Sequence, residues 1–416
     1  MKLINFNENE LIFLNNYLNK IIIYLILFFV SFILYISNIN YYQKNAIEKN
    51  QIKSYIKYIN DCKNHKRYNR KKIKNENPYI SVCIPALNMN KYIERTILSI
   101  INQSFQDFEI IIINDNSKDD TEKIIKKIQL EDNRIKLINH NINKGVYYSR
   151  VEAILFSKGK YIILMDPDDL YLNENLLKEL YNYNLNLNLD IIEFTVFQQI
   201  EGRRNIFYPK QHFESHYHNF TNNIISQPYL SEILFHLPNN NKYSYSICRN
   251  IWNKMIRRKI FLDMHNFIGL NYFYNFVVTA DDMSMNVICY HFANNYSNIY
   301  VPGYMYNIRQ VSMSHGDGGT QLGQIRAINY FLYFKIIYRY IKQFEINRII
   351  LFNELKNLKR FIYSIKDLNM TAYIKYTINF FNEILNDNFA NKIFKSFVIR
   401  LLLYFENVDN VNKLIG

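Results

Sequence analysis

Short apolar runs alternate with amphipathic segments between residues 78 and 200. The apolar runs cover residues 79–84, 108–114, 134–139, 161–165 and 190–197. Runs that are apolar on both faces are typical of parallel strands covered by helices. Helical spacing predicts helices at 91–103 and 145–157. Another helix is expected to begin near Ser117, with this serine as its capping residue. We therefore expect an α/β domain with a mainly parallel sheet flanked by helices.

Residues 21–37 are apolar and uncharged, and Lys20 and Asn38 flank them. This length is enough to cross a bilayer with little tilt. A cleaved signal peptide would have a shorter apolar region, and a buried core helix would not be apolar on every side beside a polar linker. We expect a single transmembrane anchor at 21–37, preceded by a short tail at 1–20. Lysines on both sides leave its orientation open, with a mild preference for a cytosolic C-terminal domain.

The net charge of the chain is +14, and much of the excess lies between Lys44 and Lys74. A hydrophobic content of 49% excludes a disordered basic chain. A basic run is usually a solvated stretch and less often a surface for nucleic acid or anionic lipid. We expect a basic stem at 38–77 and no nucleic-acid partner. The α/β domain is then expected at 78–315, and a helical C-terminal region at 316–416, where aromatic residues and Ile recur at helical spacing.

Three carboxylates follow the apolar run at 161–165, in the segment Asp166-Pro167-Asp168-Asp169. Open α/β sheets bind their ligands at the carboxyl ends of their strands. Acids this close repel one another, and Mg²⁺ or Mn²⁺ would remove that cost and hold a diphosphate. The simpler alternative is an acidic turn that caps the next helix, because Asp and Pro are ordinary turn residues.

The positions of the glycine residues indicate which classes of nucleotide-binding site the chain could form. The first glycine of the chain is Gly145, so no glycine-rich phosphate loop follows the first strand. A nicotinamide-dependent Rossmann enzyme and a P-loop nucleotidase are therefore disfavoured. A nucleotidyltransferase would also need a basic, glycine-rich loop there, and residues 88–92 offer only Lys91. A nucleotide would have to be held by side chains, strand-end backbone and a metal.

Five segments in order resemble the nucleotide-binding half of family 2 inverting glycosyltransferases with the GT-A fold. These segments are residues 81–88, 99–104, 113–117, 143–145 and 165–169. A looser similarity covers Trp252-Asn253-Lys254 with Arg257, Ala280-Asp281-Asp282, and Tyr306 with Arg309 and 312–314. The resemblance extends over residues 79–315 and leaves out the anchor, the stem and the C-terminal helices.

The resemblance implies a nucleotide-sugar donor site at the strand ends. The residues that it assigns to the donor are Pro85, Asn88, Asp115, Arg150, Asp166 and Arg309. Asp115 would accept hydrogen bonds from the base, although a cap on the helix near Ser117 would also explain it. A surface salt bridge explains Arg309 nearly as well.

The same resemblance implies a metal site in the acidic segment. Asp168 and Asp166 would coordinate Mn²⁺ or Mg²⁺, with His315 as a further candidate ligand for metal or phosphate. An ordinary loop histidine is the simpler interpretation of His315. Asp169 would hold the loop or cap the following helix.

An acceptor-side base is also implied. Asp282 is the expected general base that takes a proton from the acceptor hydroxyl, and Asp281 is the second candidate for that role. Two acids at a helix start would also be stabilised by the helix dipole alone.

The sequence departs from the family pattern at three sites, one of which is Asp281, where Glu is commoner and would be longer by one methylene group. Asn116 stands where the family usually has Gly, and Asn tolerates a left-handed backbone. Tyr147 and Tyr148 replace small residues before Arg150, which would narrow the donor pocket or change its selectivity.

These observations predict a membrane-anchored, metal-dependent, inverting glycosyltransferase of the hexosyltransferase type. It would move a sugar from a nucleoside-diphosphate sugar, with uridine diphosphate as the expected leaving group, to a hydroxyl of a glycan, lipid or protein. The alternative is a noncatalytic GT-A-like protein that binds a sugar or a partner, against which the intact acids Asp166, Asp168 and Asp282 argue. The expected location is a membrane crossed once: Golgi or ER in a eukaryote, otherwise the inner or plasma membrane.

Overall fold

The computed structural model describes part of the 416-residue chain. The described residues are 53–55, 57–62, 64, 75–201, 206–207, 224–227, 250–270, 281–309, 320–344, 371–387, 395 and 398–399. The chain divides into two units, Met1–Tyr58 and Ile59–Gly416. In the first unit, the described residues are helical. The labelled helices and strands all lie in the second unit.

The expected tail at 1–20 and anchor at 21–37 lie outside the described residues, as does most of the stem at 38–77. No helix in the described ranges combines the length and the apolar character needed to cross a membrane. The anchor therefore stays a prediction.

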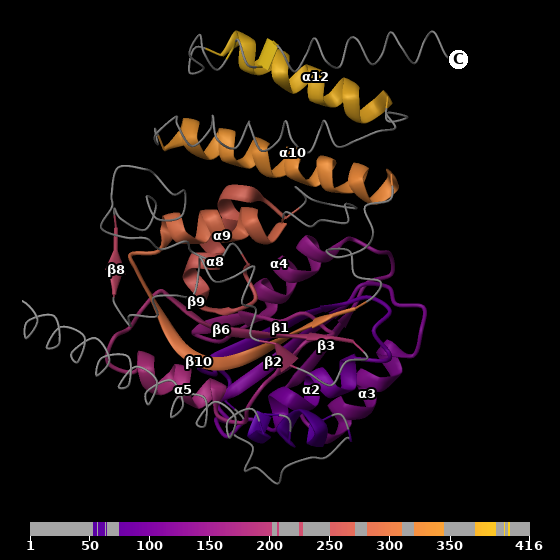
Figure 1. Ribbon diagram of the computed structural model, residues 1–416, viewed down its shortest axis with the longest axis vertical. Helices are drawn as coiled ribbons and strands as arrows, with labels where there is room; N and C mark the ends of the chain where they lie inside the picture. Colours follow the sequence, from indigo (N-terminus) through magenta and orange to yellow (C-terminus); the bar gives the residue numbers. More distant parts are fainter. Residues whose placement is uncertain are drawn as a thin grey trace, which may run out of the picture. The chain divides into compact units, whose positions relative to one another are not determined.

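The first half of the sheet is parallel, as the apolar runs predict. Its strands are β1 (Ile80–Ala86), β2 (Phe108–Asn114), β3 (Ile135–Asn139) and β4 (Tyr161–Leu164), in the order β3-β2-β1-β4. The helices α2 (Ile93–Ile101), α3 (Thr121–Glu131) and α4 (Val146–Phe156) connect them. Almost every residue of β1, β2 and β4 is buried, because helices cover both faces of the sheet (Figure 1).

The second half makes the sheet mixed, which corrects the expectation of a mainly parallel sheet. β9 (Lys254–Arg257) runs antiparallel to both β4 and β6 (Ile191–Ile200). β10 (Asn295–Ile308) is parallel to β6 and antiparallel to β5 (Leu170–Tyr171). The short strands β7 (Ile206–Phe207) and β8 (Ile225–Ser226) pair with β6 and β10. Local hydrophobic pattern does not encode strand direction, so only contacts distant in sequence set this arrangement.

Helices form layers on both sides of this sheet. Figure 1 shows α2, α3 and α5 (Leu176–Asn184) on one face and α4, α8 (Arg258–Ile268) and α9 (Asp281–Phe292) on the other. Two further helices, α10 (Thr320–Gln343) and α12 (Thr371–Asn386), follow in the C-terminal region. α10 packs directly against α9.

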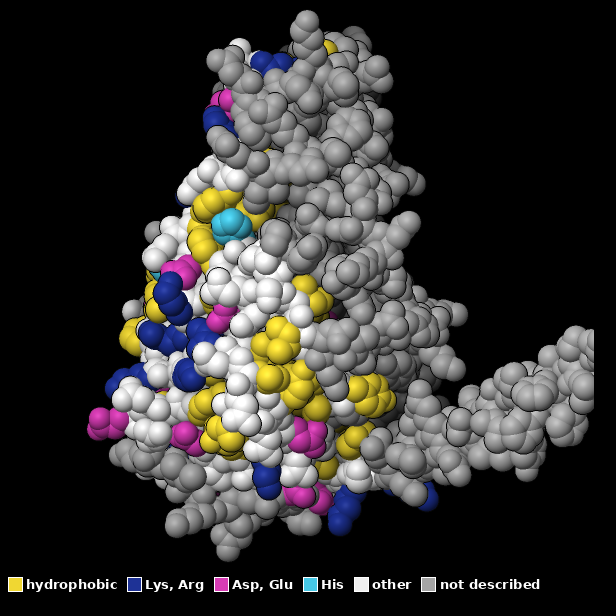
Figure 2. Space-filling view, turned by 90° about the vertical axis from the view of Figure 1, so that its left-hand side faces the viewer, with side chains coloured by type: hydrophobic (Ala, Val, Ile, Leu, Met, Phe, Trp, Pro, Cys, Tyr) yellow, Lys and Arg dark blue, Asp and Glu magenta, His cyan; other side chains and the backbone are white. Residues whose placement is uncertain are grey.

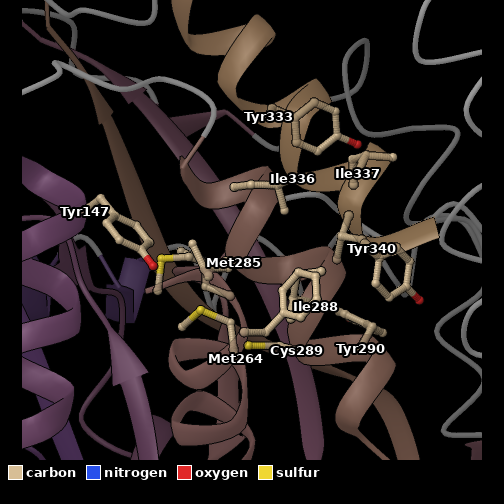
Figure 3. Packing of buried hydrophobic residues seen from close by; sticks show 14 of the residues in the cluster. Tyr147, Met264, Met285, Ile288, Cys289, Tyr290, Tyr333, Ile336, Ile337 and Tyr340 are labelled. Atoms are coloured by element: carbon tan, nitrogen blue, oxygen red, sulfur yellow. The ribbon is translucent and has the colours of Figure 1, made fainter. Parts of the chain in front are cut away.

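One apolar cluster joins the C-terminal helices to the sheet layer. Figure 3 shows side chains of α9, among them Met285 and Ile288, between Met264 of α8 and the α10 residues Ile336 and Tyr340. All five are almost completely buried. Because α9 carries the two candidate bases at its first turn, the α10 packing also fixes the position of those acids.

Positive charge on the described surface is partly compensated by nearby acids. Figure 2 shows Lys and Arg side chains gathered toward one side of that face, with acidic side chains between them. Arg257 pairs with Asp190 at 2.6 Å, and Lys259 pairs with Asp263 at 2.7 Å. The Lys259–Asp263 pair is largely exposed and contributes little to stability, whereas Arg257 and Asp190 are mostly buried.

Candidate active site

Side chains at the start of α2 donate hydrogen bonds to the backbone of the acidic loop that follows β4. Thr96 Oγ1 donates to the carbonyl oxygens of Pro167 and Asp169 at 2.9 and 2.8 Å. Arg95 donates to the carbonyl oxygen of Asp168 at 3.1 Å. Thr96 is buried, so these bonds fix the backbone of the loop and leave the Asp side chains to other partners.

Asp169 is a structural residue of this loop. Its side chain accepts a 2.6 Å hydrogen bond from the Tyr304 hydroxyl and a 2.8 Å bond from the backbone N–H of Asn307. The same Tyr304 hydroxyl accepts the backbone N–H of Asp166 at 3.1 Å. Burial, with repulsion from Asp168 and Asp166, raises the pKa of Asp169 well above its ordinary value. The sequence expectation that Asp169 holds the loop is therefore confirmed, and the loop is tied to β10.

Arg150 of α4 contacts carboxylates from both sides of the site. One terminal nitrogen donates to Asp166 Oδ1 at 2.7 Å, and the other lies 2.6 Å from Asp281 Oδ2 and also contacts Asp282. Arg150 is 5% exposed. Its Nε is buried and has no hydrogen-bond partner within the described part of the chain. One buried cation thus joins Asp166 to both acids of the first turn of α9.

Asp281 and Asp282 form the first turn of α9, where the helix dipole favours negative charge. Burial raises the pKa of Asp282 to about 7 against the opposing effect of the Arg150 charge, and repulsion from Asp281 and Asp166 adds to it. Burial also raises the pKa of Asp281. The Asp282 side chain is 19% exposed and that of Asp281 is 2% exposed, so Asp282 is the one a second substrate would reach.

Asp168 faces the end of β10. Its Oδ2 lies 2.5 Å from Nε of Arg309, although this N–H is not aligned for a hydrogen bond. Burial and the neighbouring Asp166 raise the pKa of Asp168 to about 6, against the charges of Arg309 and Arg95. Tyr92 lies under both guanidinium groups, 4.7 Å from Arg95 and 5.4 Å from Arg309. Arg309 is thus part of the acidic site rather than of an isolated surface pair.

Asp115 follows β2, and its carboxylate binds the loop before α4. Oδ1 accepts the backbone N–H of Lys144 at 2.8 Å, and Oδ2 accepts that of Gly145 at 2.9 Å. The alternative of a cap on the helix after Ser117 is wrong. That helix begins at Thr121, where Asp119 accepts the backbone N–H, and Ser117 Oγ instead accepts the backbone N–H of Asn88.

Pro85 and Asn88 lie at the carboxyl end of β1, next to this loop. Pro85 is a buried residue of β1 in register with Ile113 of β2. Asn88 has a left-handed backbone with φ 54°, and its side chain accepts the backbone N–H of Lys118 at 2.8 Å. Asn116 is also left-handed, with φ 62°, which confirms that Asn replaces the expected glycine there without loss of the turn.

The structure gathers most of the candidate residues at one edge of the sheet. Asp166, Asp168, Asp281 and Asp282 meet there with Arg150 and Arg309. α4 links this group to Asp115, because Gly145 precedes its first turn and Arg150 lies in its second. His315 lies outside the described residues, so its candidate role stays a prediction.

Two contributors, Tyr304 and Asn307, were not singled out from the sequence, and Trp252 was noted only as part of a motif. Tyr304 and Asn307 of β10 hold Asp169, and Trp252 stacks on Tyr304 and Tyr306 with ring centroids 4.8 and 5.4 Å apart. Trp252 carries part of the looser family similarity, which was the available signal. Nothing local marks Tyr304, because its partner is distant in sequence.

The donor set at the loop suits a hard divalent cation, although the described residues contain no group of three or more His, Cys, Asp or Glu arranged for metal binding. Mg²⁺ is commonly held by one or two carboxylates together with substrate phosphates. Asp166 and Asp168 provide two carboxylates at one loop. The carboxyl groups of Asp166, Asp168, Asp169, Asp281 and Asp282 outnumber the arginines Arg95, Arg150 and Arg309 by two residues. The residues therefore fit Mg²⁺ or Mn²⁺.

The fold and the acidic site at the sheet edge define an α/β protein with a candidate site at the carboxyl ends of its strands. The model for "Glycosyl transferase family 2" matches residues 81–265. The resemblance noted in the sequence is confirmed for this segment of the chain, which is similar to the glycosyl transferase family 2 domain.

Similar proteins come from several bacteria. Glycosyltransferase GlyG of Streptococcus pneumoniae is 28% identical over 129 residues, which are 31% of this chain and 42% of GlyG. A GalNAc(5)-diNAcBac-PP-undecaprenol beta-1,3-glucosyltransferase of Campylobacter jejuni is 37% identical over 93 residues, 22% of this chain and 30% of the relative. The chain thus spans less than half the length of these two relatives. A crystal structure of TarS 1–349 of S. aureus with UDP-GlcNAc is 18% identical, with a TM-score of 0.47 over 73% of this chain and 80% of that one.

Proposed function

We propose that this protein is an inverting glycosyltransferase that moves a sugar from a nucleoside-diphosphate sugar to an acceptor hydroxyl. The observation that carries the proposal is the position of Arg150 between Asp166 and Asp282. A displacement reaction needs the leaving group and the base on opposite sides of one carbon. Arg150 joins a donor-side acid to an acceptor-side acid, so both halves of the reaction lie within the reach of one side chain.

Asp282 is proposed as the general base. A carboxylate accepts a proton best when its pKa lies near the working pH, and burial brings the pKa of Asp282 to about 7. Arg150 holds one oxygen of Asp282 and orients the carboxylate. Asp281 is more deeply buried and pairs with the same guanidinium, so it serves to place Arg150.

The departing diphosphate is proposed to bind beside Asp166 and Asp168. These two carboxylates would hold the Mg²⁺ or Mn²⁺ ion, which when bound supplies positive charge to the leaving phosphates. Arg309 contacts Asp168 and lies at the end of β10, where its guanidinium can bind a phosphate oxygen. The buried Nε of Arg150, without a partner among the described residues, offers one more donor to the substrate.

The donor is proposed to carry uracil, with Asp115 as acceptor for the base. The relative from C. jejuni is named as a glucosyltransferase that acts on an undecaprenol-linked glycan. A hexose donor and a lipid-linked glycan acceptor therefore fit best, with a free glycan or a protein as the other acceptors. With the predicted anchor at 21–37, the domain would work at a membrane surface: Golgi or ER in a eukaryote, otherwise the inner or plasma membrane.

The test is release of nucleoside diphosphate by the full chain in detergent, with a panel of nucleotide sugars and Mn²⁺ or Mg²⁺. Slow hydrolysis of one donor that requires metal and is lost in Asp168→Ala supports the enzyme class. Asp282→Asn should bind the donor normally but lose transfer to an acceptor. Asp263→Asn changes a partly exposed Asp of α8 that pairs with Lys259, so it should keep full activity. Absence of both donor binding and turnover for every donor sinks the proposal in favour of a noncatalytic protein.

A further inference from the structure

His140 is a buried histidine whose two ring nitrogens both face carboxylates. It follows β3, and its backbone N–H donates to the carbonyl oxygen of Asn114 at 2.9 Å, beside the end of β2. Nδ1 lies 2.7 Å from Asp115 Oδ1, and Nε2 contacts Glu152 Oε2 on α4. The His140 side chain is 2% exposed. The ring therefore bridges the end of β2 and the face of α4.

This arrangement requires a proton on each ring nitrogen. A neutral imidazole donates from one nitrogen only, and its other nitrogen would point a lone pair at a carboxylate. Burial lowers the pKa of His140, but hydrogen bonds to Asp115 and Glu152 outweigh it, so the pKa is raised above the ordinary value. The positive charge of Lys144 opposes this shift in pKa. The ring centroids of Tyr148 and His140 lie 5.7 Å apart in a T-shaped arrangement. The bridge is thus a charged carboxylate–imidazolium–carboxylate array.

Among the contacts of the described residues, one acceptor position of Asp115 is left. A carboxylate offers about four lone-pair sites. His140 and the Lys144 backbone occupy Oδ1, and the Gly145 backbone occupies one site on Oδ2. The remaining site on Oδ2 is therefore fixed in direction by three donors on a carboxylate that is 3% exposed.

We propose that His140, supported by Glu152, is the positioning residue that presents Asp115 to the nucleobase of the donor. This inference rests on the proposed function, in which Asp115 accepts an N–H of the base. Without the bridge, Asp115 keeps its two backbone contacts but loses the side-chain donor that fixes the direction of its carboxylate. Glu152 lies behind His140 on the opposite side from Asp115, and its other oxygen lies 3.9 Å from Nζ of Lys144.

Uridine diphosphate binding to the full chain, measured by calorimetry with Mg²⁺ present, tests this role. His140→Gln keeps a neutral donor for Asp115 but cannot bridge both acids. We expect the UDP dissociation constant to rise roughly tenfold, because a charge-assisted hydrogen bond is exchanged for a neutral one. The ratio of variant to wild-type constants should shrink as pH rises, because wild-type His140 itself loses its proton. Because both proteins bind the same nucleotide at each pH, any effect of nucleotide protonation on affinity cancels in this ratio.

A second probe separates base recognition from general stability. UDP methylated at N3 of the uracil lacks the N–H that Asp115 would accept. Methylation should weaken binding to the wild-type protein clearly more than to His140→Gln, which is the signature of coupled groups. His291→Gln is the matched control. It also removes a histidine with a side-chain hydrogen bond, to Tyr340, and should change neither ratio.

Each outcome is informative. If His140→Gln lowers the melting temperature but leaves UDP affinity and the methylation effect unchanged, His140 is merely structural and the inference is overturned. If wild-type protein binds UDP and N3 methylation costs nothing, Asp115 does not accept from the base and the inference also falls. If wild-type protein binds none of UDP, GDP, CDP and ADP, the proposed function itself fails, which the first titration reveals before any variant is made.

Discussion

The hydroxyl of Tyr304 donates a 2.6 Å hydrogen bond to Asp169 Oδ2, across 135 positions of sequence. Asp169 is completely buried and belongs to the loop that carries Asp166 and Asp168. The same hydroxyl accepts the backbone N–H of Asp166. A strand near the end of the α/β domain therefore determines the shape of a loop formed near its middle.

Removing this hydroxyl should loosen the loop. Tyr304→Phe leaves Asp169 with the Asn307 N–H as its one described partner and should lower the free energy of unfolding by about 1–3 kcal/mol. The rate of donor turnover should fall by more than the loss of folded protein at the assay temperature explains. The reason is that the backbone N–H of Asp166 loses the Tyr304 hydroxyl as its acceptor. Denaturant unfolding and nucleotide release on the same preparation measure both effects. Tyr183→Phe, which removes a 2.8 Å contact with Ser297, serves as control and should leave turnover unchanged.

Arg150 should not be replaceable by lysine. A lysine keeps the positive charge but lacks the planar fork that reaches Asp166 with one nitrogen and Asp281 and Asp282 with the other. We expect Arg150→Lys to lower kcat/KM on the order of a hundredfold, because the base and the donor-side acid are no longer aligned. Steady-state kinetics with the identified donor provides the measurement.

Arg134→Lys is the matched control for this substitution. Arg134 is also buried and binds Asp132 through two nitrogens, at 3.0 and 2.7 Å, as a local pair outside the candidate site. This variant should lose stability, but its folded fraction should keep the wild-type kcat/KM. Equal losses of kcat/KM in both variants would mean that Arg150 contributes only to folding.

The sequence predicted those parts of the fold that local pattern encodes. β1, β2 and β4 were located within about two residues, because strands buried on both faces appear as unbroken apolar runs. The mixed half was not predicted, because the direction of β9 depends on pairing with β4 and β6. The start of α3 was predicted less accurately, because Ser117 binds Asn88 instead of capping this helix, which begins at Thr121.

The candidate site was predicted in part for a similar reason. The acids were found by motif. Their shared contact with Arg150 was not, because Asp281 and Asp282 lie 131 and 132 residues after it and spacing alone does not reveal such a contact. His140 gave no periodic signal. Its position after β3, the parallel neighbour of β2, is the feature that would have placed it beside Asp115.

The turn at Asn116 should accept glycine but reject a β-branched residue. Its φ of 62° is left-handed, where branched side chains collide with the backbone. Asn116→Gly should leave stability within a few tenths of a kcal/mol, whereas Asn116→Val should lower it by about 1–2 kcal/mol. Thermal unfolding of the pair provides the comparison. Similar melting temperatures for the two variants would show that the turn rearranges freely.

The pH dependence of catalysis should report the ionisation of Asp282. Burial raises the pKa of this carboxyl from its ordinary value of 3.8 to about 7, so its basic form increases as pH rises through neutrality. We expect kcat/KM to rise with pH and to reach a plateau above about 7. A rate that falls over the same interval would exclude Asp282 as the base.

Stability should change with pH in the opposite direction. Because the pKa of Asp282 is higher in the folded state, the folded protein binds more protons, and the unfolding free energy falls as pH rises from 3.8 to about 7. Asp282→Asn cannot ionise, so its unfolding free energy should depend less on pH over this interval while its transfer activity is lost at every pH. Chemical unfolding across the pH range, with Asp263→Asn as control, tests the link. An unchanged pH dependence in Asp282→Asn would mean that another group of the cluster carries the raised pKa.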